Sequence, residues 1–566
     1  MSTGARNSSS SLQHESTGWQ RASWLTDHPF HPILIGLFPL LSFYGANVGS
    51  TPPWHLWRPG AIIIAAVGAL WLILAKFLKS ARRAALITSV FVLFFFSFLY
   101  LENFAMHLWP ALAAGKSGAL TAFFAIWCGI VLGVSLLLGR MRRTEGPGTG
   151  VLNVVGIALA LTSTATAYAS YVGTRESVEE VATRQITSSP DAMTGGHKPD
   201  VFYLLMDGYG RNDTLKKYMN VDNSAFLNEL RGRGFYVADL AHSNYSQTEL
   251  SVTSTLNADY IQNVLAGIPN LPRNRRALDA LADYSTVAQK FQQEGYSYTF
   301  VSTGFPFFIG ASADVRSVNE LPGVSIFESS LIDLTPLGML HVTALSPVDQ
   351  KRQYVASAFE TLKELGQPAP RPKFVFAHIL LPHPPFVFWA DGRPRTPDTT
   401  TLFDGSMYMH DGGTKAAYIE GYSNQLEYAD RMLLPVIDAI LKQEQTKPII
   451  IIQGDHGSRM NHDFDSMTDT DFKECMAILN AYYVPEPLKS QLYPGITPVN
   501  SFRLVLRELF GADMPNLPDK SYYATWDAPT EFTDVTKLAH EADPTTKIFE
   551  PGDAGPMKIN KNPDRG

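Results

Sequence analysis

The chain contains little cysteine and no block of basic residues, and both absences limit what the protein can be. Among its 566 residues only Cys128 and Cys475 are cysteines; the first lies in an apolar run and the second in a water-soluble region, so we expect no disulfide. The formal net charge is −7 and the lysines and arginines form no basic block, which argues against nucleic-acid binding. The water-soluble region must therefore be held together by its apolar core, with or without a metal.

Long apolar runs fill the N-terminal part of the chain. Residues 32–172 are rich in Leu, Ala, Phe, Val and Ile, and five runs there are close to the ~20 residues that cross a bilayer as a helix. These runs are Pro32–Gly49, Ala61–Leu78, Ala84–Leu101, Ala119–Leu138 and Val151–Val172. Charged residues fall largely between the runs, which favours five transmembrane helices over a buried helical bundle.

The distribution of positive charge predicts an orientation in the membrane. The second and fourth links between the runs contain most of it, namely Lys76, Lys79, Arg82, Arg83, Arg140, Arg142 and Arg143. Links rich in Lys and Arg stay in the cytoplasm. With five helices, the N-terminus is then cytoplasmic and the chain after Val172 lies outside.

Composition predicts five regions along the chain. Residues 1–31 are a cytoplasmic tail, and residues 32–172 are a transmembrane domain of five helices. Residues 173–197 are a polar linker, residues 198–545 a water-soluble domain, and residues 546–566 a flexible tail rich in Pro, Gly, Asp and Lys.

Apolar strands alternate with amphipathic helices in the water-soluble domain. We expect strands in residues 200–210, 373–386 and 448–457, and a helix followed by a strand in residues 286–305. Further helices are expected in residues 224–235 and 421–445. This alternation predicts an α/β domain with a mostly parallel central sheet flanked by helices. The unbroken apolar character of the strands indicates that both faces of the sheet are covered.

Metal-ligand side chains follow three of these strands. The first strand ends at Asp207, another around His378 and His383, and the run of isoleucines at Asp455–His456. In such sheets ligands bind at the carboxyl ends of the strands. An Asp–His pair alone also suits a turn or a helix N-cap, but a second strand-terminal acid favours a metal site. Mixed oxygen and nitrogen ligands suit Zn²⁺ or Mn²⁺.

A hydroxyl-rich stretch supplies a candidate nucleophile. In SNYSQTELSVTSTLN, residues 243–257, Thr248 precedes a sequence that can begin a helix. The N-terminus of a helix favours anions such as a phosphoryl group. Metal coordination would lower the pKa of the hydroxyl and make it nucleophilic. Taken alone, the stretch is better explained as a capped loop rich in Ser and Thr that has no chemistry.

Together these features resemble the alkaline phosphatase/sulfatase superfamily over residues 198–530. With five membrane helices in front, the layout is similar to lipoteichoic acid synthases and lipid A phosphoethanolamine transferases. Those are membrane-anchored metalloenzymes that move a phospho-group from a phospholipid to an acceptor through a phosphothreonine. The resemblance implies an alkaline phosphatase-like fold.

The resemblance also implies roles for individual residues. Asp207 matches the first metal ligand, where the transferases often have Glu instead. Thr248 matches the nucleophile, which is itself a metal ligand. Asp455 and His456 match the late pair of ligands, and His383 matches a histidine that contacts the anionic group or the leaving oxygen of the substrate.

Three further histidines are candidates with a looser match. His378 and His462 are candidate ligands or acid/base groups, with a core position and a solvated loop as the alternatives, and His410 is a weaker candidate. Sulfatase activity itself is not expected. It requires a modified Cys or Ser in a C/S-x-P-x-R motif, and here Thr248 is followed by Leu250 and Val252.

The resemblance implies an enzyme that moves a phospho-headgroup from a phospholipid donor to a glycan or lipid acceptor, or hydrolyses it. It would be a multi-pass protein of the bacterial inner (cell) membrane with a periplasmic or extracellular catalytic domain. The alternative is a non-catalytic lipid-binding or regulatory membrane protein with the same fold. The joint presence of Asp207, Thr248, Asp455 and His456 favours the enzyme.

Overall fold

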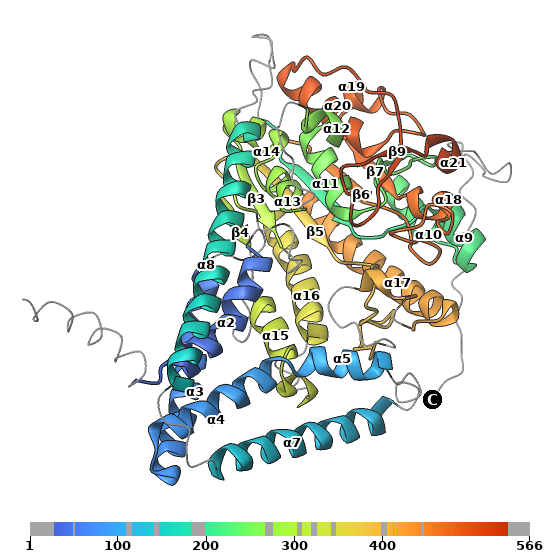
Figure 1. Cartoon of the computed structure of the whole chain (residues 1–566). Helices are drawn as coiled ribbons and strands as arrows, with labels where there is room; N and C mark the ends of the chain where they lie inside the picture. The colour runs from blue at the N-terminus through green and yellow to red at the C-terminus, as the bar shows by residue number, and fades with distance from the viewer. Residues whose placement is uncertain are drawn as a thin grey trace, which may run out of the picture. The chain divides into compact units, whose positions relative to one another are not determined.

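The structure is a computed structural model of the chain, which divides into two compact units (Figure 1). One unit comprises Met1–Gly173 and Val324–Val342, and the other comprises Thr174–Gly323 and Thr343–Gly566. The residues that the structure describes are 28–48, 51, 53–108, 116–140, 147–182, 198–266, 275–302, 308, 310–317, 325–340, 347–397, 405–410, 412–442 and 446–540.

The first unit is built from apolar helices. They are α2 (His31–Ala46), α3 (Trp57–Leu78), α4 (Ala81–Phe96), α5 (Phe98–Leu108), α7 (Lys116–Arg140) and α8 (Pro147–Ala182), and the 3₁₀ turn η1 (Pro53–Leu56) precedes α3. Three stretches are long and apolar enough to cross a membrane, namely Pro53–Leu78, Thr121–Arg140 and Gly148–Val172. A fourth is reached if α4 and Phe98–Ala105, bent by 55°, count as one span.

The predicted count of five transmembrane helices is thus not confirmed within the described residues. The first predicted run forms α2, whose 16 residues correspond to roughly 24 Å of helix, short of a hydrocarbon core of about 30 Å. The third predicted run breaks at Ser97. Its Oγ donates to the carbonyl oxygen of Leu93 at 2.7 Å, a bond that is known to bend helices.

The last apolar helix is longer than its predicted span. α8 continues past Val172 to Ala182, so the first part of the predicted linker 173–197 is helical. Residues 183–197 lie outside the described residues. The predicted tail 546–566 and residues 1–27 of the predicted cytoplasmic tail also lie outside them.

A segment from the middle of the chain belongs to the apolar unit, which the sequence did not predict. It contains α15 (Ile326–Asp333) and the 3₁₀ turn η2 (Pro336–Leu340). The ring of Phe327 lies 5.2 Å from that of Phe43. Arg58 donates through Nε to Glu328 Oε1 at 2.6 Å and through Nη2 to Oε2, a bidentate ion pair.

The second unit contains a seven-stranded sheet with the order β2-β7-β6-β1-β5-β3-β4. Its strands are β1 (Val201–Met206), β2 (Tyr236–Val237), β3 (Ser297–Val301), β4 (Val315–Ser317), β5 (Lys373–Ile379), β6 (Ile449–Gly454) and β7 (Asn480–Tyr483). β6, β1, β5, β3 and β4 pair in parallel, whereas β7 is antiparallel to both β6 and β2. The prediction of a mostly parallel sheet is confirmed, and a separate pair is formed by β8 (Tyr522–Tyr523) and β9 (Thr533–Asp534).

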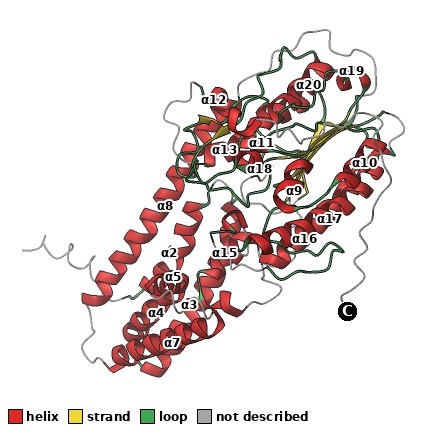
Figure 2. Cartoon of the chain, turned by 90° about the vertical axis from the view of Figure 1, so that its right-hand side faces the viewer, coloured by secondary structure: helices red, strands yellow, loops and turns green. Residues whose placement is uncertain are grey.

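Helices cover both faces of this sheet (Figure 2). One face packs against α9 (Asn212–Met219), α10 (Ser224–Gly232), α16 (Pro347–Leu365) and α17 (Lys415–Leu441). The other packs against α11 (Thr248–Asn257), α13 (Arg276–Asp283), α14 (Thr286–Gln293), α19 (Glu486–Lys489) and α20 (Pro498–Phe510). The remaining helices are α12 (Ile261–Val264), α18 (Phe472–Met476) and α21 (Thr536–His540), and the remaining 3₁₀ turn is η4 (Gly405–Met407).

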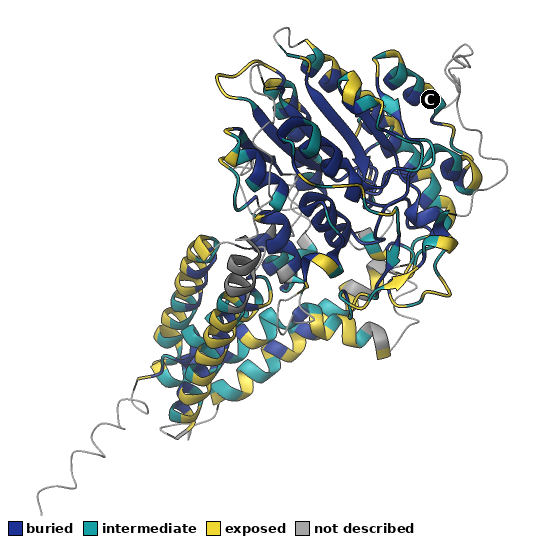
Figure 3. Ribbon diagram, turned by 90° about the horizontal axis from the view of Figure 1, so that it is seen from above, coloured by how far each residue is buried: buried dark blue, intermediate teal, exposed yellow. Residues whose placement is uncertain are grey.

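The central strand shows why the sequence lacks an alternating polar pattern. In β1, Leu204 and Met206 belong to one apolar cluster and Tyr203 and Leu205 to the other. All six residues of β1 are fully buried. In Figure 3 the strands at the centre of the sheet are drawn in the dark blue of buried residues. Because side chains alternate along a strand, a strand that is covered on both faces must be apolar throughout.

Candidate metal centre and its surroundings

The three predicted ligand-bearing strands are neighbours in the sheet. β1 lies between β6 and β5, and Met206 is paired with Gly454 on one side and Ile379 on the other. Asp207 and Asp455 therefore occupy the next position on adjacent parallel strands. His378 lies in β5 itself, and His383 follows that strand by four residues. The structure thus brings these side chains to one edge of the sheet, as the sequence predicted.

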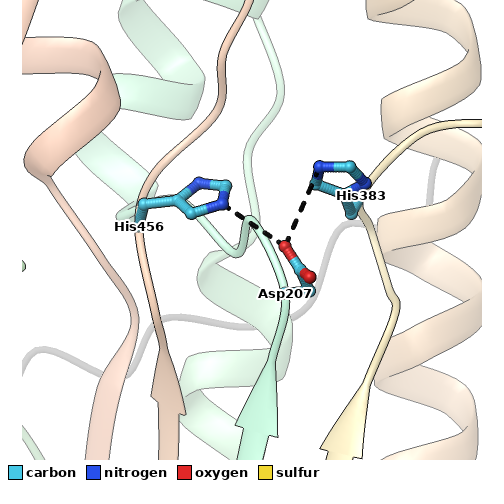
Figure 4. A group of neighbouring side chains, drawn as sticks. All are labelled: Asp207, His383 and His456. Atoms are coloured by element: carbon cyan, nitrogen blue, oxygen red, sulfur yellow. Dashed lines mark ion pairs between the residues drawn. The ribbon is translucent and has the colours of Figure 1, made fainter. Parts of the chain in front are cut away.

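Two overlapping groups of ligand atoms form at this edge. Asp207, His383 and His456 make up the first (Figure 4), and Asp207, His378 and Asp455 the second, with the ligand atoms of each group within 4.8 Å of one another. Asp207 Oδ1 lies 3.3 Å from His456 Nε2 and 4.0 Å from His383 Nε2. Asp207 Oδ2 lies 3.1 Å from His378 Nε2.

The hydrogen bonds of His456 leave its second nitrogen facing acceptors. Its Nδ1 lies 2.7 Å from the carbonyl oxygen of Gly457 and donates to it, so a neutral ring has a lone pair on Nε2. Nε2 faces Asp207 Oδ1 and, at 3.4 Å, Asp455 Oδ2. Within the described part of the chain, none of these three buried atoms has a hydrogen-bond partner. With a neutral His456, three buried acceptors converge without a donor, an arrangement that a cation would satisfy, so these residues fit a divalent metal.

The other carboxylate oxygen of Asp455 holds the backbone in place. Asp455 Oδ1 accepts from the N–H groups of Gly208 and of His456, each at 2.9 Å. Gly208 has φ +73°, a conformation that favours glycine, and its turn lets the chain leave β1 beside His456 and His383. The glycine after Asp207 is therefore part of the site.

The charge state of Asp207 follows from its neighbours. Burial raises the pKa of this fully buried carboxyl, but the neighbouring His383 and the hydrogen bond with His378 more than offset that effect. The pKa of Asp207 lies well below its usual range, so this side chain is an anionic ligand near neutral pH.

Thr248 is the first residue of α11, as predicted, and is 6 % exposed. The loop before it is tied to the metal-ligand strand, because Ser243 Oγ donates to the carbonyl oxygen of Asp455. Arg275 also holds this segment, because it forms an ion pair with the buried Glu249 and donates to Gln247 Oε1 at 2.6 Å. The nucleophilic role of Thr248 stays a prediction.

The looser histidine candidates take different positions. His378 belongs to the second ligand group, with its ring 5.9 Å from that of Phe308. His462 is outside both groups and its ring packs on Phe464 at 4.6 Å. Burial, with Arg459 and His456 nearby, holds the pKa of His462 well below its usual range. His410 is exposed, beyond η4.

Two residues near the site were missed by the sequence analysis. Arg459 is 7 % exposed and donates through Nη1 to Ser406 Oγ at 3.2 Å. Ser406 Oγ lies 3.3 Å from His383 Nε2. An arginine three positions after a strand-terminal histidine is a usable sequence pattern, whereas nothing in the sequence around Ser406 indicated its position.

Several solved structures are similar to this chain, all at low sequence identity. The C-terminal periplasmic domain of EcEptC from Escherichia coli, in complex with Zn, is 10 % identical with a TM-score of 0.40, over 62 % of this chain and 96 % of that one. The soluble domain of lipooligosaccharide phosphoethanolamine transferase A from Neisseria meningitidis is 12 % identical with a TM-score of 0.37, over 58 % of this chain and 93 % of that one. The phosphonate monoester hydrolase of Agrobacterium radiobacter is 14 % identical with a TM-score of 0.35, over 58 % of this chain and 80 % of that one.

Sequence comparison identifies the family directly. No curated protein matches the chain. The model of the sulfatase family matches residues 199–486, a range that contains the strands β1, β5 and β6 and all the candidate ligands. The chain therefore belongs to the sulfatase family.

Proposed function

We propose that the protein is a membrane-anchored, metal-dependent phosphotransferase or phosphodiester hydrolase that uses Thr248 as its nucleophile. The observation that carries the proposal is the set of buried acceptor atoms on Asp207, Asp455 and His456, which have no donor among the described residues. A buried cluster of this kind is costly unless a cation binds there. Membership of the sulfatase family supports chemistry at a tetrahedral ester centre.

Asp207, Asp455 and His456 would hold Zn²⁺ or Mn²⁺, with Thr248 as a further ligand and His378 as a candidate for a second ion. When bound, such an ion lowers the pKa of a coordinated hydroxyl and neutralises charge that develops on a transferring group. The low pKa of Asp207 keeps the required anionic ligand available at neutral pH.

The chain's own residues then divide the reaction between them. Thr248 Oγ gives its proton to solvent water and attacks phosphorus, so an O–P bond forms as the P–O bond to the leaving group breaks. His383, held through Nδ1 by the carbonyl oxygen of Pro384 at 2.5 Å, protonates the leaving oxygen from Nε2. In the second half, an acceptor hydroxyl or water gives its proton to His383 and attacks phosphorus. The bond from phosphorus to Thr248 Oγ breaks, and that oxygen regains a proton from solvent water.

A phospholipid is the proposed donor and a glycan or lipid hydroxyl the proposed acceptor. The three or four candidate membrane spans in the first unit support a substrate that resides in a bilayer. We place the protein in a bacterial inner membrane, with its N-terminus in the cytoplasm and its catalytic domain on the periplasmic or extracellular side.

Intact mass of the full-length protein tests the nucleophile. Wild type and Thr248→Ala are incubated in mixed phospholipid micelles with Zn²⁺ or Mn²⁺. We expect an added phospho-headgroup on wild type alone, and its mass identifies the group. An unmodified wild type that also releases no headgroup would refute the proposal and favour the non-catalytic lipid-binding alternative. Equal adducts on both proteins would place the nucleophile elsewhere.

A further inference from the structure

Arg459 is a buried cation without an anionic partner. Its side chain is 7 % exposed, and its two side-chain hydrogen bonds go to neutral oxygens, Ser406 Oγ at 3.2 Å and the carbonyl oxygen of Ser246 at 2.9 Å. In the part of the chain that the structure describes, no carboxylate pairs with it, and its buried Nε has no acceptor. Burying an unpaired guanidinium costs several kcal/mol, on the order of the penalty for other buried ions.

The position of Arg459 links the two halves of the proposed site. Its Nη2 donates to Ser246, which lies two residues before Thr248. Its Nη1 donates to Ser406, whose hydroxyl is 3.3 Å from His383 Nε2. The guanidinium thus bridges the segment before the proposed nucleophile and an imidazole of the metal group.

The surroundings of Arg459 contain two aromatic side chains and another buried polar group without a partner. The guanidinium carbon lies 5.0 Å from the ring centroid of Phe464, and the Arg459 backbone N–H donates to Tyr418 Oη at 3.0 Å. Ser246 Oγ is also buried without a hydrogen-bond partner among the described residues. A fixed cation beside an unused hydroxyl is the arrangement expected of an oxyanion site that is built before its ligand arrives.

We infer that Arg459, together with the hydroxyls of Ser246 and Ser406, binds a non-bridging oxygen of the phosphoryl group that the enzyme transfers. This inference rests on the proposed function. The planar donors of a guanidinium match the oxygens of phosphate, and a charge-assisted bond is stronger than a neutral one. Charge spreads over the equatorial oxygens in phosphoryl transfer, so the guanidinium stabilises that state as well as the bound group.

Arg503 is a matched control. It too is 7 % exposed, but it lies in α20 and its donors reach backbone carbonyls, Nε to Pro515 at 2.6 Å and Nη1 to Ala258 at 2.7 Å. No nitrogen of Arg503 is an orphaned buried donor within the described residues. Arg503→Met therefore measures the structural cost of losing a buried arginine without touching the site.

The test measures binding of inorganic phosphate to the full-length, zinc-loaded protein by equilibrium dialysis with radiolabelled phosphate. Loss of one charge-assisted bond of about 1.5–3 kcal/mol corresponds to roughly 10- to 150-fold weaker binding, which we expect for Arg459→Met. Arg459→Lys retains the positive charge but lacks the planar pair of N–H donors. Its affinity for phosphate is expected to lie between those of Arg459→Met and wild type. Arg503→Met is expected to bind phosphate as wild type does, and all variants are expected to retain zinc.

Three results would overturn the inference: phosphate binding by Arg459→Met equal to wild type, an equal loss in Arg503→Met, or no measurable binding by the wild type. The proposed function fails separately. If Thr248→Ala and wild type gained the same added mass in the adduct experiment while phosphate binding still depended on Arg459, the nucleophile would be wrong and the oxyanion site would stand.

Discussion

Replacing Asp455 with Asn changes one atom of the cluster from an acceptor to a donor. Asp455 Oδ1 holds the backbone N–H groups of Gly208 and His456, and an amide oxygen can keep both bonds. The new NH₂ then stands where Oδ2 stood, 3.4 Å from His456 Nε2. That nitrogen has a lone pair but no donor within the described residues, so the variant satisfies it without a metal.

The expected change in stability caused by Asp455→Asn is positive without metal and negative with metal. A hydrogen bond gained by a buried orphan group contributes about 1 kcal/mol, so metal-free Asp455→Asn should be more stable than metal-free wild type. Metal at a hundred times its Kd stabilises a folded protein by about 2.7 kcal/mol. If the lost ligand weakens binding a hundredfold, the same metal concentration contributes only about 0.4 kcal/mol.

The assay is the thermal unfolding midpoint of the full-length protein in detergent, with EDTA and with added Zn²⁺. Asp430→Asn is the matched control, because the carboxyl of Asp430 is also buried but pairs with Tyr209 Oη at 2.5 Å, away from the cluster. Burial raises the pKa of Asp430 well above its usual range, which favours the neutral acid that an amide resembles. A zinc shift in Asp455→Asn as large as in wild type and in Asp430→Asn would refute the assignment of Asp455 as a ligand.

Three further predictions concern pH, the helical unit and the nucleophile. Burial raises the pKa of Glu474 to about 7. The contribution of Glu474 to the stability of the folded protein is therefore complete below its ordinary pKa near 4.5, and it is lost as pH rises through 7. The thermal unfolding midpoint of Glu474→Gln should not change with pH for this reason over the same range. Equal pH profiles of wild type and variant would contradict the prediction. Arg58→Ala and Glu328→Ala should show a coupling energy of about 1 kcal/mol in a double-mutant cycle. This value is at the upper end for a surface ion pair, because Arg58 is 44 % exposed but Glu328 only 9 %. Additive effects of the two substitutions would mean that the ion pair does not contribute to stability. Thr248→Ser should still form the covalent adduct, and its absence there would argue against a hydroxyl nucleophile at this position.

The sequence predicted the ligand-bearing strands well because few folds accommodate such runs. Four successive isoleucines followed by Asp455–His456 require a strand covered on both faces, and β6 is fully buried. The ends of parallel strands meet at one edge, so the positions of Asp207 and Asp455 at two strand ends were enough to expect them together. The register of β1 against β6 confirms that these carboxylates are neighbours.

The membrane helices were predicted less accurately because the break of a helix depends on local hydrogen bonds. Hydropathy treats Ala84–Leu101 as one run, but the hydroxyl of Ser97 bonds Leu93 and the helix axis turns there. Hydropathy likewise has no means of assigning Val324–Val342 to the helical unit, since the contacts of Phe327 and Glu328 join residues far apart in the chain.

By itself, the sequence determined the class of fold, the placement of the candidate ligands Asp207, Asp455 and His456 at strand ends, and the helix that begins at Thr248. These follow from local patterns, namely apolar runs, strand ends and helix starts, whose physical causes lie within a few residues. Only the tertiary structure decided that His383 joins the ligand group while His462 does not, and that Arg459 is buried without a carboxylate among the described residues. Those facts depend on which loops meet at the edge of the sheet, and long-range packing alone determines that.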